Sequence, residues 1–273
     1  MNNDFVQATG DQYGEITSSP LADTAQQVEA GKIIIHKEPR ISANKLAEYV
    51  VADPTRQKAI IRDCKFARKV VIVHYKKTRD FIARAFAPDS LDIDKLVRRA
   101  EEIERENAEA GVHEISDWLR NDNANSALAL KKIAVVAPDL SWKNAGLFHG
   151  RLEGIQIAGV KVSIHPEIIF SFEHRNIKKV GAIILNTAKG HERSLDRKNG
   201  AYCVGDYLSS LLFQMLLLRA HRIGAPLNSK CYAVDVFREK TYTAPASYRT
   251  LNKNLEAACE VIALRWPEIK QKA

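Results

Sequence analysis

Several features that mark common protein classes are missing from this chain. Its longest strongly apolar run covers residues 207–218, whereas a helix that spans a bilayer needs roughly 20 apolar residues. The first residues lack the basic-then-apolar pattern of a signal peptide. No Cys-x-x-Cys pair occurs among the four cysteines, which are Cys64, Cys203, Cys231 and Cys259. We therefore expect a cytoplasmic chain with reduced thiols, no structural zinc and no membrane segment.

Motifs of several enzyme classes are also absent. The chain contains no phosphate-cradling P-loop and no Gly-x-Gly-x-x-Gly fingerprint. Ser209 and Ser210 lie outside any Gly-x-Ser-x-Gly elbow, which argues against a serine hydrolase. His149 and His191 lack the spacing of metal ligands, and His165 is separated from Glu167 by a proline.

Basic residues are missing from the start of the chain and abundant after it. Residues 1–31 contain five acidic residues and no Lys or Arg, so the rest of the chain carries a net charge of +13. Residues 42–84 alone contain eleven basic and four acidic side chains. A body this basic favours a polyanion, with DNA or RNA first and an anionic membrane surface second. A solvated basic face with no partner is the alternative.

The first half of the chain has mainly helical patterns. The acidic leader, 1–31, has no apolar periodicity, so we expect it to be disordered. Residues 32–137 then form a mainly helical region after one short strand at 32–36. We expect its helices, with Ser42 and Asp53-Pro54 as start signals, at 43–51, 55–66, 75–86, 92–110, 114–119 and 126–136. The polar segment 121–125 is interpreted as a turn between the last two, and 69–74 fits strand or helix.

The second half changes to β-strand patterns. After a loop at 138–150, residues 150–273 are expected to form an α/β core. Ala158-Gly159 indicates a hairpin between strands at 152–157 and 160–164, and Glu167 continues the second strand after Pro166. Further elements are expected as a buried strand at 180–185, an apolar helix at 202–222, strands at 231–237 and 241–244, and a closing helix after Ser247.

The order of strand, strand, strand, long helix and strand over 152–245, with Pro166-Glu167 on the second strand, resembles the core of the PD-(D/E)xK nucleases. Ser42, Leu46 and Tyr49 followed by Asp53-Pro54 resemble the entry helix of RecB-type and CRISPR-associated members. Asp53 stands where some of those members have a cluster-binding cysteine, so no iron–sulfur cluster is implied. Tyr207 and Gln214 have the wrong order and spacing for the RecB-type Gln-x-x-x-Tyr motif.

The resemblance implies a restriction-endonuclease-like mixed sheet flanked by helices and a Mg²⁺-dependent phosphodiesterase site. Glu167 matches the first metal-binding acid, but Ala182 and Ile184 stand where the third strand should carry an acid and a lysine. Asn186, one pleat further, and Lys189 are the nearest substitutes as catalytic groups. The alternatives are a strand-end salt bridge for Glu167 and a solvated loop position for Lys189.

Asp235 lies in a strand that is otherwise apolar. Because an unpaired buried carboxylate is costly, it should have a partner. It is a candidate second metal ligand with Glu167; a basic structural partner is the alternative.

The sequence thus predicts a nucleic-acid-binding protein with a PD-(D/E)xK-like core and a weak or inactive nuclease site. DNA or RNA would contact the basic residues Arg62, Lys65, Arg68, Lys69, Lys178, Lys179 and Arg193. The alternative is a non-catalytic scaffold or adaptor subunit, with a protein partner, in a phage-defence or mobile-element complex. A third possibility is an α/β sheet unrelated to nucleases.

Overall fold

The computed structural model describes residues 33–68, 75–111, 115–188 and 202–271. The predicted disordered leader, the ambiguous segment 69–74 and all of residues 189–201 lie outside the described residues. Helices and mixed sheets together build the fold, so the predicted α/β class is confirmed. No helix in these ranges is long and apolar enough to cross a membrane.

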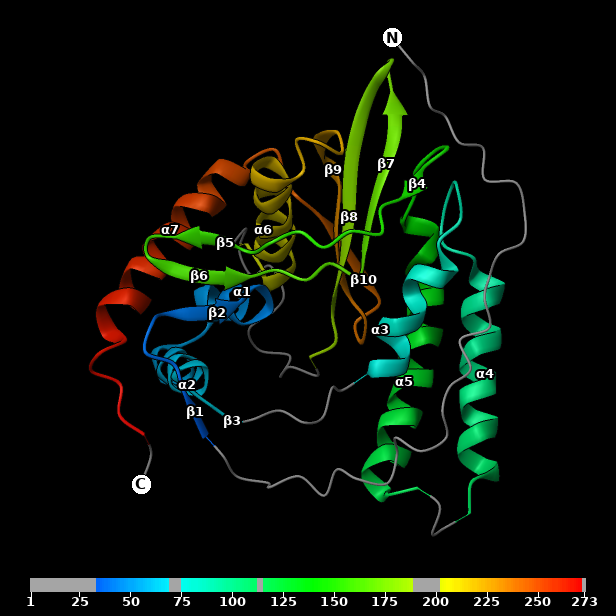
Figure 1. Cartoon of the computed structure of the whole chain (residues 1–273), viewed down its shortest axis with the longest axis horizontal. Coiled ribbons are helices and arrows are strands. Elements are labelled where there is room, and N and C mark those ends of the chain that lie inside the picture. The colour runs from blue at the N-terminus through cyan, green and yellow to red at the C-terminus, as the bar shows by residue number, and fades with distance from the viewer. Residues whose placement is uncertain (1–32, 69–74, 112–114, 189–201, 272–273) are drawn as a thin grey trace.

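A five-stranded mixed sheet forms the centre of the fold (Figure 1). Its strands, in spatial order, are β10 (Lys240–Thr243), β9 (Ala225–Asp235), β8 (Ile177–Asn186), β7 (Ile168–His174) and β4 (Gly146–Leu147). β8 pairs antiparallel with β7 and parallel with β9. The parallel pair requires a crossover connection, which α6 (Val204–Arg219) supplies.

The two faces of this sheet are covered by different helices (Figure 1). One face packs against α6, α1 (Ala43–Val51), α2 (Pro54–Lys65) and α7 (Tyr248–Arg265). The other face packs against α3 (Lys76–Ile82), α4 (Ile93–Glu109) and α5 (Asp117–Val136). Short 3-10 turns follow at η1 (Ala83–Ala85) and η2 (Ala137–Asp139). The helical first half is therefore divided between both faces of the sheet.

A three-stranded sheet lies beside the face that α6 covers. Its order is β2 (Arg40–Ser42), β6 (Val160–Ser163) and β5 (Ile155–Ile157). The hairpin predicted at Ala158-Gly159 is confirmed, since both residues have positive φ angles of 43° and 80°. A third pair joins β1 (Ile33–Ile35) to β3 (Phe66–Arg68).

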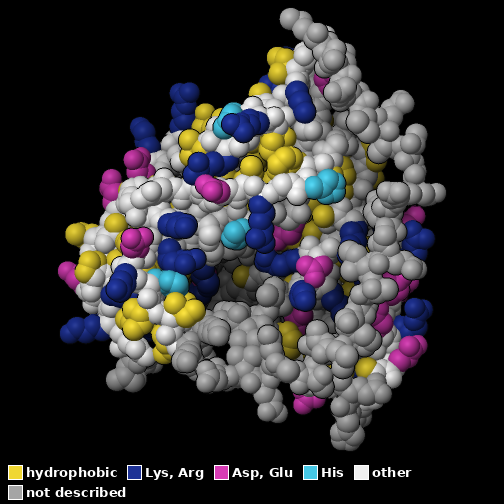
Figure 2. All heavy atoms as spheres, viewed as in Figure 1, with side chains coloured by type: hydrophobic (Ala, Val, Ile, Leu, Met, Phe, Trp, Pro, Cys, Tyr) yellow, Lys and Arg dark blue, Asp and Glu magenta, His cyan; other side chains and the backbone are white. Residues whose placement is uncertain are grey.

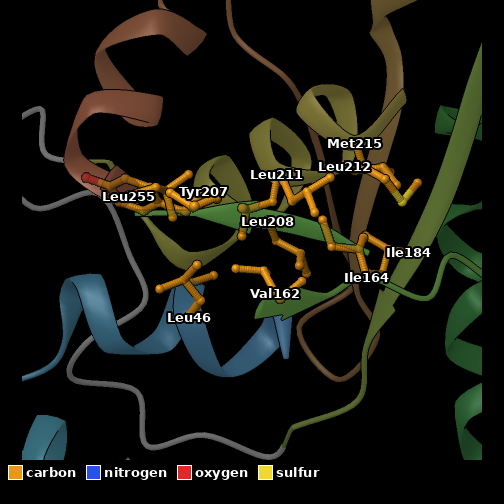
Figure 3. Packing of buried hydrophobic residues seen from close by; sticks show 14 of the residues in the cluster. Leu46, Val162, Ile164, Ile184, Tyr207, Leu208, Leu211, Leu212, Met215 and Leu255 are labelled. Atoms are coloured by element: carbon orange, nitrogen blue, oxygen red, sulfur yellow. The ribbon is translucent and has the colours of Figure 1, made fainter. Parts of the chain in front are cut away.

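The apolar helix α6 is the centre of the larger core. Its side chains Leu208, Leu211 and Leu212 point toward residues of α1 and of both sheets, as Figure 3 shows. These residues are Leu46, Val162, Ile164 and Ile184. Nearly every residue of α6 up to Leu216 is buried, as its apolar sequence predicts. We refer to this core as cluster 1, and to the core under α4 and α5 as cluster 2.

The predicted turn at 121–125 is wrong, because α5 runs through it without a break. Asp122 and Asn123 are both buried there. The Asp122 carboxylate accepts a hydrogen bond from the Tyr75 backbone N–H at 2.8 Å, and the Asn123 amide donates to Asn107 at 3.3 Å. Hydrogen bonds to the residue before α3 and to α4 thus replace the bonds that water would make to these polar side chains in a turn.

The predicted single sheet over 152–245 is also wrong in its first strands. The β5–β6 hairpin pairs with β2 instead of continuing into β7. Pro166 has no N–H to donate, and the chain passes from one sheet to the other around it. On the edge away from β8, β7 pairs with β4, which lies within the predicted loop 138–150. The strand predicted at 231–237 begins earlier, at Ala225, as the long strand β9.

Candidate functional site

Glu167 lies at the point where β7 and β8 separate. Regular pairing ends at Ile168 and Ile183, and the Glu167 backbone N–H still donates to the Ile183 carbonyl at 2.9 Å. Its Oε2 then accepts from the Leu185 N–H at 2.8 Å. The side chain therefore satisfies a strand N–H beyond the last backbone pair, where Pro166 diverts the chain.

The second oxygen of this carboxylate faces α3. Oε1 of Glu167 lies 3.3 Å from Nη1 of Arg79, and the Glu167 side chain is only 5% exposed. Burial raises the pKa of Glu167 to about 7, because desolvation outweighs the attraction of Arg79 and the hydrogen bond from Leu185. The sequence predicted two alternative roles for Glu167, a metal ligand and an ion pair at a strand end. The contacts that the structure shows are those of the ion pair.

Asn186 ends β8 and is also buried. Its Oδ1 lies 3.5 Å from the Asn44 amide nitrogen of α1 and accepts from the Ala188 N–H at 3.3 Å. The same Asn44 amide donates to the Leu185 carbonyl at 3.3 Å. Glu167 is thus held from α3, on the cluster 2 face, whereas Asn186 is held from α1, on the cluster 1 face.

Asp235 ends β9, with a side chain that is also buried. Its Cα partners are Asn186 on β8 and Lys240 on β10. Because β8 lies between β9 and β7, Asp235 and Glu167 are separated by two strand spacings, or about 10 Å. The structure brings Glu167, Asn186 and Asp235 to one end of the sheet without making them neighbours in a single cluster. Lys189 lies outside the described residues.

These residues do not fit a magnesium ion. Mg²⁺ requires oxygen ligands in near-octahedral geometry, but both Glu167 oxygens face a cation or an N–H. The positions that should complete the site, Ala182 and Ile184, are fully buried in cluster 1. Within the described ranges, no group of three or more His, Cys, Asp or Glu side chains could hold a metal ion.

A hollow of about 470 Å³ lies between the start of α6 and β10. Its buried acid, Asp206, accepts hydrogen bonds from the Cys203 N–H at 3.0 Å and from the Cys203 thiol at 3.3 Å. The contact with the Cys203 N–H is half of a capping box at the first turn of α6. Asp206 thus has a structural role, and the hollow is no substitute for the metal site.

The predicted nucleic-acid contacts are scattered over the molecule. Lys178, which is exposed, and Lys179, which is half-buried, lie at the start of β8, about 23 Å from Asn186 by the rise of a strand. Arg62 lies on α2, 3.9 Å from Asp63. Arg68 ends β3. Lys69 and Arg193 lie outside the described residues.

Lys65 has a structural position. Its ammonium group donates to the carbonyls of Trp266, Pro267 and Ile269 at 2.7, 3.2 and 2.9 Å. These carbonyls follow the end of α7, where a cation is favourable because it also interacts with the helix dipole. A phosphate contact by Lys65 would compete with this cap.

Two residues at the site were missed by the sequence analysis. Arg79 neutralises Glu167, and Asn44 ties α1 to the end of β8. Each lies on a helix far from its partner in the sequence, and neither belongs to a motif. No local signal could have identified them.

Comparison with models of known protein families, with curated proteins and with solved structures gives no match.

Proposed function

We propose that this chain binds nucleic acid through a PD-(D/E)xK-type core and does not cleave it. The order of elements supports the fold part of the proposal. In the central sheet, α5 is followed by the antiparallel strands β4, β7 and β8, with the β5–β6 hairpin inserted between β4 and β7. The crossover helix α6 and the parallel strand β9 come next. α5 and α6 cover opposite faces of the sheet. This is the arrangement that the resemblance implies, with β4 in place of the predicted first strand.

The observation that carries the functional part is the Arg79–Glu167 pair. A nuclease of this type would use that carboxylate to hold a metal ion. Here an arginine and a backbone N–H engage it, and apolar residues replace the acid and the lysine on β8. We infer that a nuclease-type fold is retained and that the metal-dependent step is lost.

Charge supports nucleic acid as the partner. The chain beyond residue 31 has a net charge of +13, which favours polyanions. Figure 2 shows Lys and Arg side chains gathered across the middle of one face of the molecule. The proposed contacts at Lys178, Lys179 and Arg62 lie on other elements, at the start of β8 and on α2.

Two assays on the full chain test the proposal. Fluorescence anisotropy with labelled 20-nucleotide single strands and duplexes, from about 50 to 200 mM KCl, should show salt-dependent binding. Incubation of the same DNA and RNA with Mg²⁺ or Mn²⁺ should give no cleavage. Metal-dependent cleavage that disappears in Glu167→Gln would overturn the loss of activity.

A second candidate function is a non-catalytic scaffold or adaptor subunit. It is favoured by the side chains of β1, because Ile33, Ile34 and Ile35 are 40–58% exposed. Three consecutive exposed isoleucines on a short strand are typical of a surface that another protein covers. Absence of nucleic-acid affinity at about 100 mM salt, together with co-elution with the product of a neighbouring gene in gel filtration, would favour this function.

A further inference from the structure

The outer face of the three-stranded sheet is polar and basic. Arg40 of β2 and Lys161 of β6 are Cα partners in a parallel pair, and both are exposed. The residues next to them, Ile41 and Val162, are buried in cluster 1. Because side chains alternate along a strand, Arg40 and Lys161 project from the same outer face.

This face continues toward the junction of the two sheets. Lys161, Ser163 and His165 occupy alternate positions, and Ser42 is the Cα partner of Ser163. If the chain continues at the rise of a strand, Lys161 and His165 are about 13 Å apart. The polar row therefore runs from the paired cations to the segment just before Glu167.

Two more cations lie at the far end of the row. Partial burial, followed by the positive charges of Arg151 and Arg79, lowers the pKa of His165. Arg79 also pairs at 3.3 Å with Glu167, two residues after His165, so it lies at this end of the row. The Arg79 side chain is 37% exposed, and its guanidinium pairs with the buried carboxylate of Glu167. Glu167 therefore positions Arg79 at the surface rather than binding a metal ion.

We propose that Arg40, Lys161, His165, Arg151 and Arg79 form one track, the basic track, that binds the phosphate backbone of nucleic acid. This inference rests on the proposed function and names the surface that performs it. Lysine, arginine and serine side chains are common donors to phosphate oxygens. A track of 13 Å or more would face about four phosphates of one strand at 3.4 Å per charge. In Figure 2, basic side chains cross the middle of the face toward α3.

The chemistry of the track favours nucleic acid over a membrane surface. A protein that lies on a bilayer inserts apolar side chains beside its cations. Among the described residues, the large exposed apolar side chains lie on β1, α4, α5, α6, α7 and the start of β8, and none belongs to the outer face of the small sheet.

The test compares two double variants, each of which replaces two cations with glutamine. The double variant Arg40→Gln/Lys161→Gln removes two track cations, and Lys95→Gln/Arg98→Gln removes two exposed cations of α4, which packs on the other face of the central sheet. Binding of a labelled 20-nucleotide single strand is measured by anisotropy between about 50 and 200 mM KCl. Thermal melts check that both variants fold.

The track variant should bind about tenfold more weakly at low salt, and its slope of log affinity against log salt should fall by about 1.4. The α4 variant should keep the slope of the unmodified chain. Binding with an unchanged slope in the track variant would overturn the track but not the proposed function. Absence of binding by the unmodified chain would overturn both. Sedimentation with phosphatidylserine vesicles that depends on Arg40 and Lys161, without DNA binding, would assign the track to a membrane.

Discussion

The two ends of β8 differ in how their charged and polar side chains are stabilised. At its start, Lys178 is exposed and Lys179 is half-buried, and Lys178 has the exposed Glu173 as its Cα partner. At its other end, Glu167 and Asn186 are buried, and each has specific partners from a helix. Water stabilises the charges at the first end, whereas the protein must supply every partner at the second. Substitutions at the buried end should therefore reduce the stability of the fold more than substitutions at the solvated end.

The middle of β8, between these two ends, is apolar. Between the two ends, β8 contributes Val180, Ala182 and Ile184 to cluster 1. An acid and a lysine at the last two positions would give the strand a nuclease site, but they would require a polar environment on that face. Apolar residues there stabilise the contact with α6, and neither position carries a side chain that could bind a metal ion.

The largest effect should follow from a charge placed in the apolar middle of β8. Ile184→Lys introduces the lysine of the nuclease motif at a side chain that is 2% exposed. Burial of an unpaired ammonium group should destabilise the fold by about 4 kcal/mol or more. Urea denaturation measures the change. The control Ile184→Val should cost about 1 kcal/mol, and equal losses in both variants would show that the site is not apolar.

The next effect depends on pH and concerns Glu167→Gln. The folded-state pKa of about 7 lies above the ordinary value of 4.5. The folded chain therefore holds this proton more tightly, and the resulting stability is complete below about pH 4.5 and is lost as the pH rises through 7. The unmodified chain should lose about 3 kcal/mol over this window, and the glutamine variant should not.

Urea denaturation of both proteins at pH 5 and pH 8 tests this expectation. Other groups titrate equally in the two chains, so only the difference between them is informative. Glu167→Gln should gain on the unmodified chain as the pH rises. A difference that stays constant between pH 5 and pH 8 would contradict the shifted pKa.

A smaller effect is expected where α1 meets the buried end of β8. Asn44→Ala removes the amide that contacts the Leu185 carbonyl and Asn186. Loss of these long hydrogen bonds should destabilise the fold by about 1 kcal/mol. The neighbouring Lys45→Ala, which removes a surface ion pair with Glu48, should cost less than about 0.5 kcal/mol. Thermal melts that rank the two variants in reverse would argue against the link between α1 and β8.

The smallest effect on stability is expected at the solvated end. The double variant Lys178→Gln/Lys179→Gln should change the free energy of unfolding by less than about 0.5 kcal/mol. If these lysines contact phosphates as proposed, DNA binding should weaken two- to threefold and lose part of its salt dependence. Unchanged binding would remove them from the proposed interface.

The sequence was most informative where a local pattern decides the structure. The caps at Ser42 and Asp53 begin α1 and α2 as predicted, because each side chain accepts a backbone N–H of the first turn. The Ala158-Gly159 hairpin and the buried helix α6 follow from turn chemistry and apolar content. These features depend on neighbours within a few residues.

The sequence was least informative where distant segments meet. The passage of the chain between two sheets at Pro166, and the pairing of β2 with β6, involve residues far apart in the sequence. The polar residues Asp122 and Asn123 suggest a turn until Tyr75 and Asn107 are seen to satisfy them. At the site, Glu167 could be selected as important, but its role depends on Arg79, which no pattern indicates.

The cap that Lys65 places on α7 has a consequence for the order in which the chain can fold. Lys65 binds carbonyls as late as Ile269, and the Trp266 indole donates to the His36 carbonyl at 3.1 Å. During synthesis, these early residues must wait until about 200 more have emerged before they find their partners. The α4–α5 hairpin, whose contacts are local, can form long before then. The half built around cluster 1 is therefore completed last.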